Sequence, residues 1–334
     1  SLFLQMKGRR KVTLEELRLQ VFVDDPLAVA RGTPARRNRL FTMLVLGWRL
    51  LSIPLASHKS QIGTVIIWIG IELQWKYNDV IATIPADKVA ELTALTNEIL
   101  ANNVVSNKIL RSYAGKVQSI AHLLFTLRPF LSEAWAALHS PSEGAPPNMT
   151  WVKQFRTALL WLRVFLAKKK GPIVRVFSAD MFFGSSGVLI IIASDASPKG
   201  MGAYIRAQCN GHYRTLSLFA IPVSAEDVSY LSLDPGQASC QQLVESLCIL
   251  IALRIWVHIW AKKRRTLQAD LDNMTSIAML AKMKASTQSL RKIAREMAMI
   301  FADVAHEPRL VRHAPGVMHV VPDKLSRKLE DASW

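Results

Sequence analysis

The feature that most constrains the fold is an apolar run that ends directly at an aspartate. Val188–Ala193 is apolar throughout, and Ser194 and Asp195 follow it. A continuous apolar run bounded by turn residues is consistent with a buried strand. A small-residue turn then leads into a second strand-like run, Gly202–Ile205. Because a carboxylate at the end of a buried strand is costly unless a cation compensates it, we expect partner carboxylates for a metal ion elsewhere in the chain.

The charge of the chain indicates a polyanionic partner. The 334 residues include 42 Lys and Arg against 25 Asp and Glu, a formal net charge of +17 that is scattered along the sequence. Such a surplus is most simply explained by nucleic acid. A ribosomal-type or membrane-surface protein fits less well, because the charge is not gathered in a tail. The hydrophobic content of 50% excludes a disordered tail protein.

The cysteines and the apolar stretches bear on the compartment. Cys209, Cys240 and Cys248 form no CxxC pair and are expected to be reduced thiols of an intracellular protein, in the cytoplasm or the nucleus. Arg49 and Arg254 interrupt the most apolar stretches, which are also short. We therefore expect no membrane-spanning segment.

From Val188 onward the pattern predicts a mixture of strands and helices. Strands are expected at 188–194, 201–206, 212–218, 266–271 and 309–313, and helices at 241–260, 273–284, 288–305 and 321–329. The ends or first turns of these elements carry four acids, namely Asp195, Glu245, Asp272 and Asp323. In a sheet with helices packed across it, such positions meet at one edge. Four converging carboxylates would repel strongly unless a divalent metal neutralised them.

The chemistry of these acids predicts the ion and the reaction. Oxygen ligands without a Cys/His cluster favour Mg²⁺ or Mn²⁺ over zinc. Two such ions can hydrolyse a phosphodiester, because one activates the attacking water and the other stabilises the leaving 3′-oxygen. Plainer interpretations stay open at single positions. Glu245 could be a surface acid, Asp272 could cap a helix, and Asp270 shares a strand face with Asp272 and is a rival ligand.

The order of the four acids resembles the RNase H domain of retroelement polyproteins over about residues 188–329. The motifs that carry this resemblance are Ser194–Ser197 with Gly200 and Gly202, Leu243–Glu245, Leu271–Asn273, and His313–Gly316 through Pro322–Arg327. The closing motif departs from the family, since His319 stands near a usual Asn and Pro322 replaces an Ala. The resemblance implies two metal ions held by the four acids, with Asn273 among the nucleic-acid-binding residues. It also implies cleavage of the RNA strand of RNA–DNA hybrids.

Three upstream motifs resemble a reverse transcriptase of the gypsy-like or tyrosine-recombinase-encoding retrotransposons. They are Phe22–Asp25 for the metal-binding hairpin, Lys59 for the lysine of the next motif, and Trp68, Ile69 and Gly70 for the primer-grip turn. The resemblance implies that Asp24 and Asp25 are metal ligands, although an isolated pair of this kind is more often an acidic turn. The family places another metal-binding Asp further upstream. We therefore expect a fragment of a longer protein or a decayed element copy that does not polymerise by itself.

The resemblance divides the chain into four parts within an α+β or α/β fold. They are the C-terminal part of a polymerase palm (1–84), a helical thumb or connection (85–140), a linker with a basic helix (141–187), and an RNase H-like mixed sheet with flanking helices (188–334). Helices are expected at 86–100, 108–127, 128–138 and 151–166. A generic helical bundle explains residues 85–140 almost as well. Lys168, Lys169 and Lys170 end the last helix and either contact phosphates or form a solvated helix end.

Two function classes follow from these patterns. The first is an RNA–DNA hybrid ribonuclease of the RNase H type, derived from an RNA-directed DNA polymerase. The alternative is a catalytically inactive remnant that binds nucleic acid. A recombinase or integrase is disfavoured, because the helix-borne Glu245 precedes Asp272 in the chain instead of following it.

Overall fold

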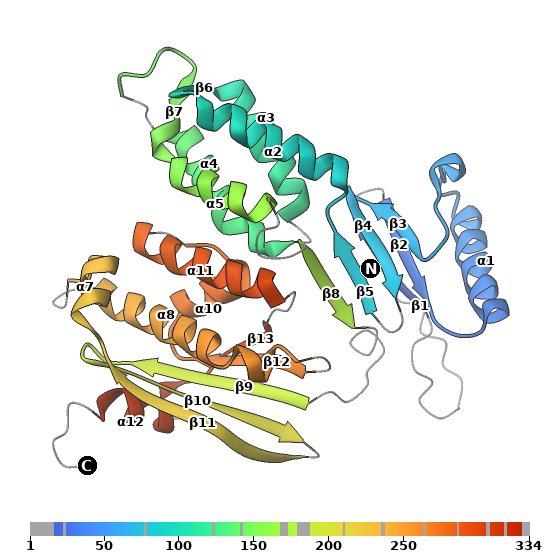
Figure 1. The fold of residues 1–334 in the computed structure, drawn as a ribbon. Coiled ribbons are helices and arrows are strands. Elements are labelled where there is room, and N and C mark those ends of the chain that lie inside the picture. The colour runs from blue at the N-terminus through green and yellow to red at the C-terminus, as the bar shows by residue number, and fades with distance from the viewer. Residues whose placement is uncertain are drawn as a thin grey trace. The chain divides into compact units, whose positions relative to one another are not determined.

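The computed structural model divides the chain into two compact units (Figure 1). One unit comprises residues 1–81 with 177–186, and the other residues 82–176 with 187–334. The structure describes residues 17–22, 25–76, 79–121, 124–140, 143–167, 173–178, 188–209, 211–234, 238–262, 265–285, 287–304, 308–316 and 319–328. Within these ranges, none of the helices has both the length and the apolar composition needed to cross a membrane.

The first described element of the first unit is an antiparallel hairpin. Strand β1 pairs with β2 in a register that joins Phe22 to Asp25 at the closed end. Helix α1 follows, with the side chain of Thr33 accepting a hydrogen bond from the Arg36 backbone and Pro34 in the first turn. Both residues suit a helix start. The elements are β1 (Leu17–Phe22), β2 (Asp25–Ala30), α1 (Pro34–Leu50) and η1 (Ser57–Lys59).

A second hairpin joins β3 and β4 through a tight turn. Trp68 pairs with Ile71, so Ile69 and Gly70 form a two-residue loop, with φ of 43° and 80°. Positive φ at both positions is the requirement of a type I′ turn, which matches the twist of the flanking strands. The four-stranded sheet has the order β3-β4-β5-β8. Its strands are β3 (Val65–Trp68), β4 (Ile71–Lys76), β5 (Asp79–Thr83) and β8 (Val174–Ser178).

The second unit opens with a helical part. Its elements are α2 (Ala86–Ala101), β6 (Val104–Ser106), α3 (Asn107–Ala121), η2 (Phe125–Leu127), α4 (Arg128–His139), β7 (Met149–Trp151), η3 (Val152–Gln154) and α5 (Arg156–Leu166). The helix expected from Trp151 begins at Arg156 instead, because Trp151 pairs with Val104 in a two-stranded ladder. The helix expected to reach Leu127 ends at Ala121.

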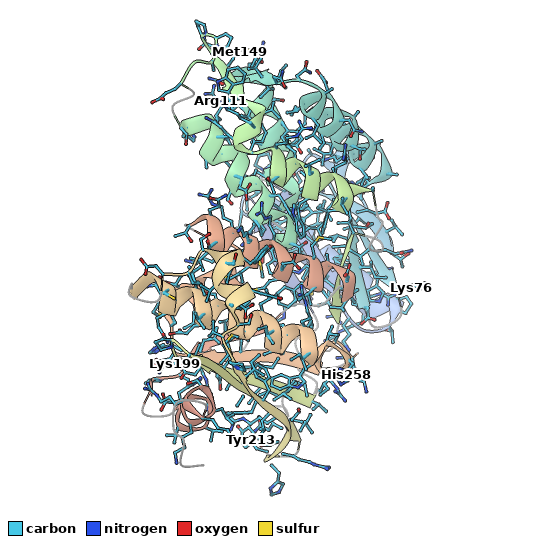
Figure 2. All side chains as sticks on the ribbon, turned by 60° about the vertical axis from the view of Figure 1, so that its left-hand side comes forward. Lys76, Arg111, Met149, Lys199, Tyr213 and His258 are labelled. Carbon is cyan, nitrogen blue, oxygen red and sulfur yellow. The ribbon has the colours of Figure 1, made fainter. Side chains whose placement is uncertain are left out.

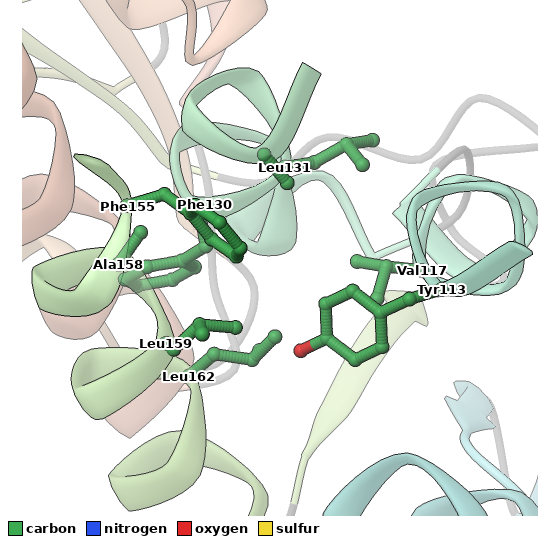
Figure 3. Close-up of a pocket in the computed structure, with 9 residues that line it drawn as sticks. Tyr113, Val117, Phe130, Leu131, Phe155, Ala158, Leu159 and Leu162 are labelled. Carbon is green, nitrogen blue, oxygen red and sulfur yellow. The ribbon is translucent and has the colours of Figure 1, made fainter. Parts of the chain in front are cut away.

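A small apolar pocket lies between α3, α4 and α5 (Figure 3). Tyr113 borders it and forms a hydrogen bond of 2.9 Å with the hydroxyl of Thr96. The other lining residues are apolar, among them Phe130, Phe155 and Leu159. A buried Tyr hydroxyl with a partner and an otherwise apolar lining are the features of a packed core, so this pocket carries no ligand chemistry.

A five-stranded mixed sheet forms the rest of the second unit. Its order is β11-β10-β9-β12-β13, with β11, β10 and β9 antiparallel and β9, β12 and β13 parallel. The strands are β9 (Val188–Ala196), β10 (Gly200–Cys209), β11 (His212–Pro222), β12 (Arg265–Leu271) and β13 (Pro308–His313). The helices are α7 (Ala225–Leu231), α8 (Ala238–Ile255), α9 (Val257–Trp260), α10 (Met274–Lys282), α11 (Gln288–Val304) and α12 (Val320–Arg327).

The central strand β9 is covered on both faces. Ile190, Ile191, Ile192 and Ala193 are each at most 1% exposed, so side chains of both pleat directions are buried. Figure 1 shows α8 and α11 on one side of the sheet and α12 on the other. An apolar run instead of an alternating pattern is what such a doubly covered strand requires. The predicted α+β fold with a mixed sheet and flanking helices is therefore confirmed.

Helix α11 also packs against the helical part of the second unit. Arg295 of α11 donates a hydrogen bond of 2.8 Å to Glu133 of α4, and both residues are below 10% exposed. The Phe301 ring lies 6.0 Å from Phe125 of η2 and 5.8 Å from Trp260. These contacts join the helices of residues 82–176 to the sheet layer through one core.

Candidate active site

Asp195 lies near the end of β9, on the face that α12 covers. Its side chain accepts a hydrogen bond of 3.1 Å from the hydroxyl of Ser326 on α12. Its partner across the antiparallel ladder is Gly202. A Cβ at Gly202 would overlap the backbone of Ser326, and one at Gly200 would overlap the Ser326 carbonyl. The two glycines therefore allow α12 to approach the strand closely enough for Ser326 to reach Asp195.

The environment of Asp195 disfavours its charged form. Burial raises the pKa of its carboxyl group, and the charge of Asp323 raises it further. The hydrogen bond from Ser326 and the nearby His319 act in the opposite direction. A carboxyl group with a raised pKa, held among other acids at a strand end, is a candidate functional group.

Glu245 comes from α8, which crosses the other face of the sheet. Gln241, one turn earlier, donates to the Glu245 carboxylate at 3.1 Å and also bonds to the Ala196 carbonyl. Burial raises the pKa of Glu245 to about 7, and the charges of Asp195 and Asp272 add to this effect. Glu245 is therefore within the electrostatic reach of two of the other predicted acids, and the interpretation as a solvated surface acid is disfavoured.

Asp272 directly follows the end of β12. The cap of helix α10 is its neighbour Asn273, whose side chain accepts from the backbone of Thr275 at 2.7 Å. The interpretation of Asp272 as the cap is therefore wrong. Its carboxylate lies 3.3 Å from Nε2 of His313, and the Cβ of a residue at 316 would come within 3.2 Å of it.

Asp323 occupies the first turn of α12. Its carboxylate accepts a hydrogen bond of 2.7 Å from Arg327, one turn later on the same helix. The backbone of this turn is fixed by His319, whose ring nitrogen is 3.0 Å from the Ser194 carbonyl and whose own carbonyl accepts from the Asp323 amide. His319 thus joins the start of α12 to β9 and places Asp323 near Asp195.

Asp270, the rival of Asp272, has a different set of partners. Arg312 of β13 donates to both of its oxygens, at 3.1 and 2.6 Å, and Gln268 donates at 2.7 Å. The side chain is only 4% exposed. A two-point contact with a guanidinium satisfies a buried carboxylate, so Asp270 is engaged inside the sheet and Asp272 is the better candidate ligand.

The four predicted acids are close enough for their charges to interact, but their side chains do not meet at one point. Among the described residues, no three Asp, Glu, His or Cys side chains are close enough to hold a metal ion as they stand. The charges nevertheless act on one another, Asp323 on Asp195 and both Asp195 and Asp272 on Glu245. Asp195 accepts a hydrogen bond from the neutral side chain of Ser326, and Glu245 from the neutral side chains of Gln241 and Asn273. An all-oxygen donor set, in which the charges of neighbouring acids raise the pKa of Asp195 and of Glu245, fits Mg²⁺ or Mn²⁺.

Several residues of this site were not predicted from the sequence. Ser326 and Gln241 bond to the acids directly, and the Cys248 thiol donates to the Asp195 carbonyl at 3.3 Å. Each lies three or four residues from a predicted acid on the same helix. Ser326 follows Asp323 on α12, and Gln241 and Cys248 flank Glu245 on α8. The helical spacing of i, i+3 and i+4 is the signal that could have identified them.

The upstream motifs lie in the first unit. Asp25 begins β2 and is exposed, whereas Asp24 lies outside the described residues. The Trp68 indole donates to the Asp25 carbonyl at 3.1 Å, so the structure joins the two predicted polymerase motifs. Lys59 ends η1 and is exposed. The three lysines Lys168, Lys169 and Lys170 lie outside the described residues.

Neither a family model nor a curated protein matches this sequence. Solved structures do. LC11-RNase H1 in complex with an RNA/DNA hybrid is similar at 11% identity and a TM-score of 0.31, over 41% of this chain and 92% of that one. RNase H1 from Halobacterium salinarum is similar at 12% identity and a TM-score of 0.31, over 43% of this chain and 98% of that one. The foamy viral protease-reverse transcriptase in complex with an RNA/DNA hybrid is similar at 12% identity and a TM-score of 0.36. The match covers 89% of this chain and 36% of that one.

Each of these solved structures is at most 12% identical to this chain. This chain spans about a third of the foamy viral chain. With TM-scores of 0.31 to 0.36, they carry no argument about substrate or activity. We therefore base the function on the carboxylates and on the sheet that positions them.

Proposed function

We propose that the sheet domain of this chain hydrolyses the RNA strand of RNA–DNA hybrids with the help of divalent metal ions. The observation that carries the proposal is that four acids act on one another's charges from different parts of the sheet domain. They are Asp195 on β9, Glu245 on α8, Asp272 directly after β12, and Asp323 on α12. Burial and mutual repulsion raise the pKa of Asp195 and of Glu245. Such a site is unfavourable when empty and becomes favourable when a cation is present.

The residues have distinct parts in this proposal. The metal ions, Mg²⁺ or Mn²⁺, would supply a nucleophilic water and stabilise the leaving 3′-oxygen. Asp195 and Glu245 would hold them from the two faces of the sheet, with Asp272 and Asp323 closing the set. Asp272 and Asp323 would first release His313 and Arg327, which now engage their carboxylates. Because Glu245 must lose its proton to act as a ligand, metal binding is expected to weaken as the pH falls below about 7.

The substrate class follows from the charge and from the resemblance of the sequence motifs to RNase H domains. A net charge of +17 fits a nucleic-acid backbone. The resemblance implies a duplex of near-A form, which proteins recognise through its shape and 2′-hydroxyl groups and not by its sequence. We therefore propose an RNA–DNA hybrid as the partner, in the context of a retroelement reverse transcriptase whose polymerase motifs are Asp24, Asp25 and Lys59, with a primer grip at Trp68, Ile69 and Gly70.

The experiment uses a hybrid with a labelled RNA strand, incubated with the full chain and Mg²⁺. We expect endonucleolytic cuts in the RNA strand, no cuts in the DNA strand, and no cleavage with EDTA. Asp195→Asn should lower the rate at least ~100-fold, because even an indirect partner of a metal ligand is worth 10–100-fold. Asp87→Asn, the same change of charge in the first turn of α2, is the matched control and should cleave as the wild type does.

Three results would contradict the proposal. Cleavage that is unchanged in Asp195→Asn would assign the activity to another site. Binding of the hybrid without any cleavage by the wild type would favour the alternative, an inactive nucleic-acid-binding remnant. Cleavage by Asp87→Asn as slow as by Asp195→Asn would show that surface charge, and not the carboxylate site, controls the rate.

A further inference from the structure

A second polar cluster lies on the same sheet face as Asp195. Ala193, two residues before Asp195, pairs with Tyr204 on one side and with Asp270 on the other, and Asp270 pairs with Arg312. Side chains two residues apart on a strand point to the same face and are about 7 Å apart. The row from Tyr204 to Arg312 is therefore the next row along the sheet from the row of Asp195.

An arginine stacks between two tyrosines in this cluster. The guanidinium of Arg206 lies 5.4 Å from the ring centre of Tyr204 and 4.7 Å from that of Tyr213. Tyr213 pairs with Gln208, two residues beyond Arg206, so it shares the same face. Cation–π contacts of this kind hold the planar guanidinium in one orientation. We call these residues, together with Asp270, Gln268 and Arg312, the Arg–Tyr cluster.

The Arg–Tyr cluster is open to solvent and has an excess of positive charge. Tyr213 is 55% exposed, and the side chains of Arg312 and Arg206 are 59% and 28% exposed. Asp270 is the single carboxylate of the cluster, and Arg312 already bonds to both of its oxygens. Arg206 is 4.0 Å from the same carboxylate, and its Nε has no hydrogen-bond partner among the described residues. One guanidinium satisfies Asp270, so the second is in excess for a purely structural contact.

Helix α12 leaves this part of the face uncovered. The helix packs over the row of Gly200 and Gly202, where a Cβ would overlap Leu325 or Ser326. Tyr213, at the far end of the strand pair, lies on the side of the sheet away from α8 and α11 (Figure 2). Tyr213 and Arg312 are thus exposed on the same face of the sheet that α12 covers at Asp195.

We propose that the Arg–Tyr cluster binds an unpaired stretch of nucleic acid that continues from the strand held at the carboxylates. The proposal rests on the proposed function for the nature of the ligand. Arg206, the guanidinium in excess, matches the charge of a phosphate, and the exposed ring of Tyr213 offers a surface on which a base can stack. Stacking on an aromatic ring together with a neighbouring arginine is the general means of holding single strands without reading their sequence.

The experiment compares two labelled hybrids by fluorescence anisotropy in EDTA, so that no cleavage occurs. One hybrid is blunt, and the other carries an unpaired extension, of RNA in one set and of DNA in another. Tyr213→Ala should weaken binding of an extended hybrid about 5-fold or more and leave the blunt hybrid unchanged. Tyr213→Phe, which keeps the ring, should retain wild-type binding of both.

A salt series separates the role of the guanidinium from that of the ring. Arg206→Gln should lower the slope of log affinity against log salt by about 1 for the extended hybrids. The matched control is Arg214→Gln, since Arg214 is exposed on the neighbouring strand β11 but pairs with Ala207 and points to the opposite face. This control should change the slope equally for blunt and extended hybrids. Urea midpoints equal to that of the wild type would show that the variants are folded.

The outcomes distinguish this proposal from the proposed function. If Tyr213→Ala binds the extended hybrids as tightly as the wild type does, the subsite is wrong, whether or not the protein cleaves RNA. If the wild type does not cleave but Tyr213→Ala selectively loses the extended hybrid, the proposed function fails and the subsite stands. Equal loss of blunt and extended hybrids in Tyr213→Ala would also overturn the subsite, because the effect would not depend on the unpaired strand.

Discussion

Asp270 and Asp195 lie on adjacent strands of one sheet and share a face, but their surroundings differ. Asp270 is 3% exposed and bonds to the guanidinium of Arg312 at two points. Asp195 bonds to the hydroxyl of Ser326, and burial raises its pKa. The first carboxylate is compensated within the protein, whereas the second is held among other acids. A buried acid that the chain itself does not neutralise is the one to examine for an external cation.

A third carboxylate extends the comparison. Glu133 is buried like Asp270 and has its own guanidinium, that of Arg295. The chain therefore can compensate a buried acid with an arginine, and it does so at two separate places. Asp195 and Glu245, whose hydrogen-bond partners Ser326 and Gln241 are neutral, therefore differ from Asp270 and Glu133, which are paired with arginines. Four predictions, in order of decreasing effect, test this difference.

The largest effect is expected from breaking a compensated pair. Glu133→Leu leaves the charge of Arg295 buried at 6% exposure, and an arginine cannot lose its proton to relieve this. We expect a loss of about 3–5 kcal/mol in the free energy of unfolding, measured by urea denaturation. The control is the double change Glu133→Leu with Arg295→Leu, which removes both charges and should recover most of the loss. A double variant as unstable as the single one would show that packing, and not charge, is responsible.

The next effect concerns the response to metal. At 10 to 100 times its dissociation constant, Mg²⁺ should stabilise the wild type by roughly 1–3 kcal/mol, measured as a rise in the unfolding temperature. Asp195→Asn should lose most of this rise. Asp270→Asn should be less stable than the wild type at every Mg²⁺ concentration but keep the rise, because its carboxylate is engaged by Arg312. If the two variants respond to Mg²⁺ alike, the distinction between the two aspartates is wrong.

A smaller effect is expected from pH in the absence of metal. Burial raises the folded-state pKa of Glu245 from its ordinary value of 4.5 to about 7, so between these values the folded state binds more protons than the unfolded state. The contribution of Glu245 to stability is therefore fully present below about pH 4.5 and is lost as the pH rises to 7. For this half-buried side chain we expect a loss of about 1–2 kcal/mol after solvent screening.

The measurement is the difference in urea midpoint between the wild type and Glu245→Gln in EDTA, at pH 5 and at pH 8. The variant carries no charge at this position, so it should be relatively more stable than the wild type at pH 8 and lose that advantage at pH 5. A difference that is independent of pH would exclude Glu245 as a titrating group.

The smallest effect is expected from the exposed ion pair on α12. Arg327→Gln removes the partner of Asp323, and side chains of the pair are 58% and 44% exposed. An exposed pair one helical turn apart contributes about 0.3–0.5 kcal/mol, so stability should change little. Because Asp323 is then released toward Asp195, the Mg²⁺ concentration at half-maximal stabilisation should fall. An unchanged Mg²⁺ response would show that Arg327 does not restrain Asp323.

The elements of the sheet domain could be predicted because the spacing of apolar residues and the positions of turn residues indicate the same boundaries there. The strand expected at 188–194 is observed as Val188–Ala196, and the helix expected at 288–305 as Gln288–Val304. The long helix expected at 241–260 divides at Trp256 into α8 and α9. No Gly or Pro marks this break, so local pattern gives no signal for it. Trp151 was misplaced for a related reason, since its pairing partner Val104 is distant in sequence.

The acids of the site could be proposed from their positions, and helical spacing could have identified neighbours on the same helix, but contacts between different elements could not be predicted. Asp270 and Asp272 are equivalent in strand alternation, and Arg312, which separates them, lies 42 residues beyond Asp270 on β13. The parallel register that brings Arg312 to Asp270 is a property of the folded sheet. The same holds for Ser326 and Asp195, whose contact depends on how closely α12 approaches the strand. The sequence therefore identifies the charges, and the fold decides which of them are compensated.

The close approach of α12 to Gly200 and Gly202 has a consequence for the evolution of such chains. Any side chain at Gly202 would overlap the backbone of Ser326 and displace α12 together with Asp323, while every acid in the sequence stays in place. A diverging copy could thus lose its site by a single substitution at a residue with no chemistry of its own. A survey of relatives that counts acids alone would class such a copy as intact, whereas one that includes the two glycines would recognise the damage.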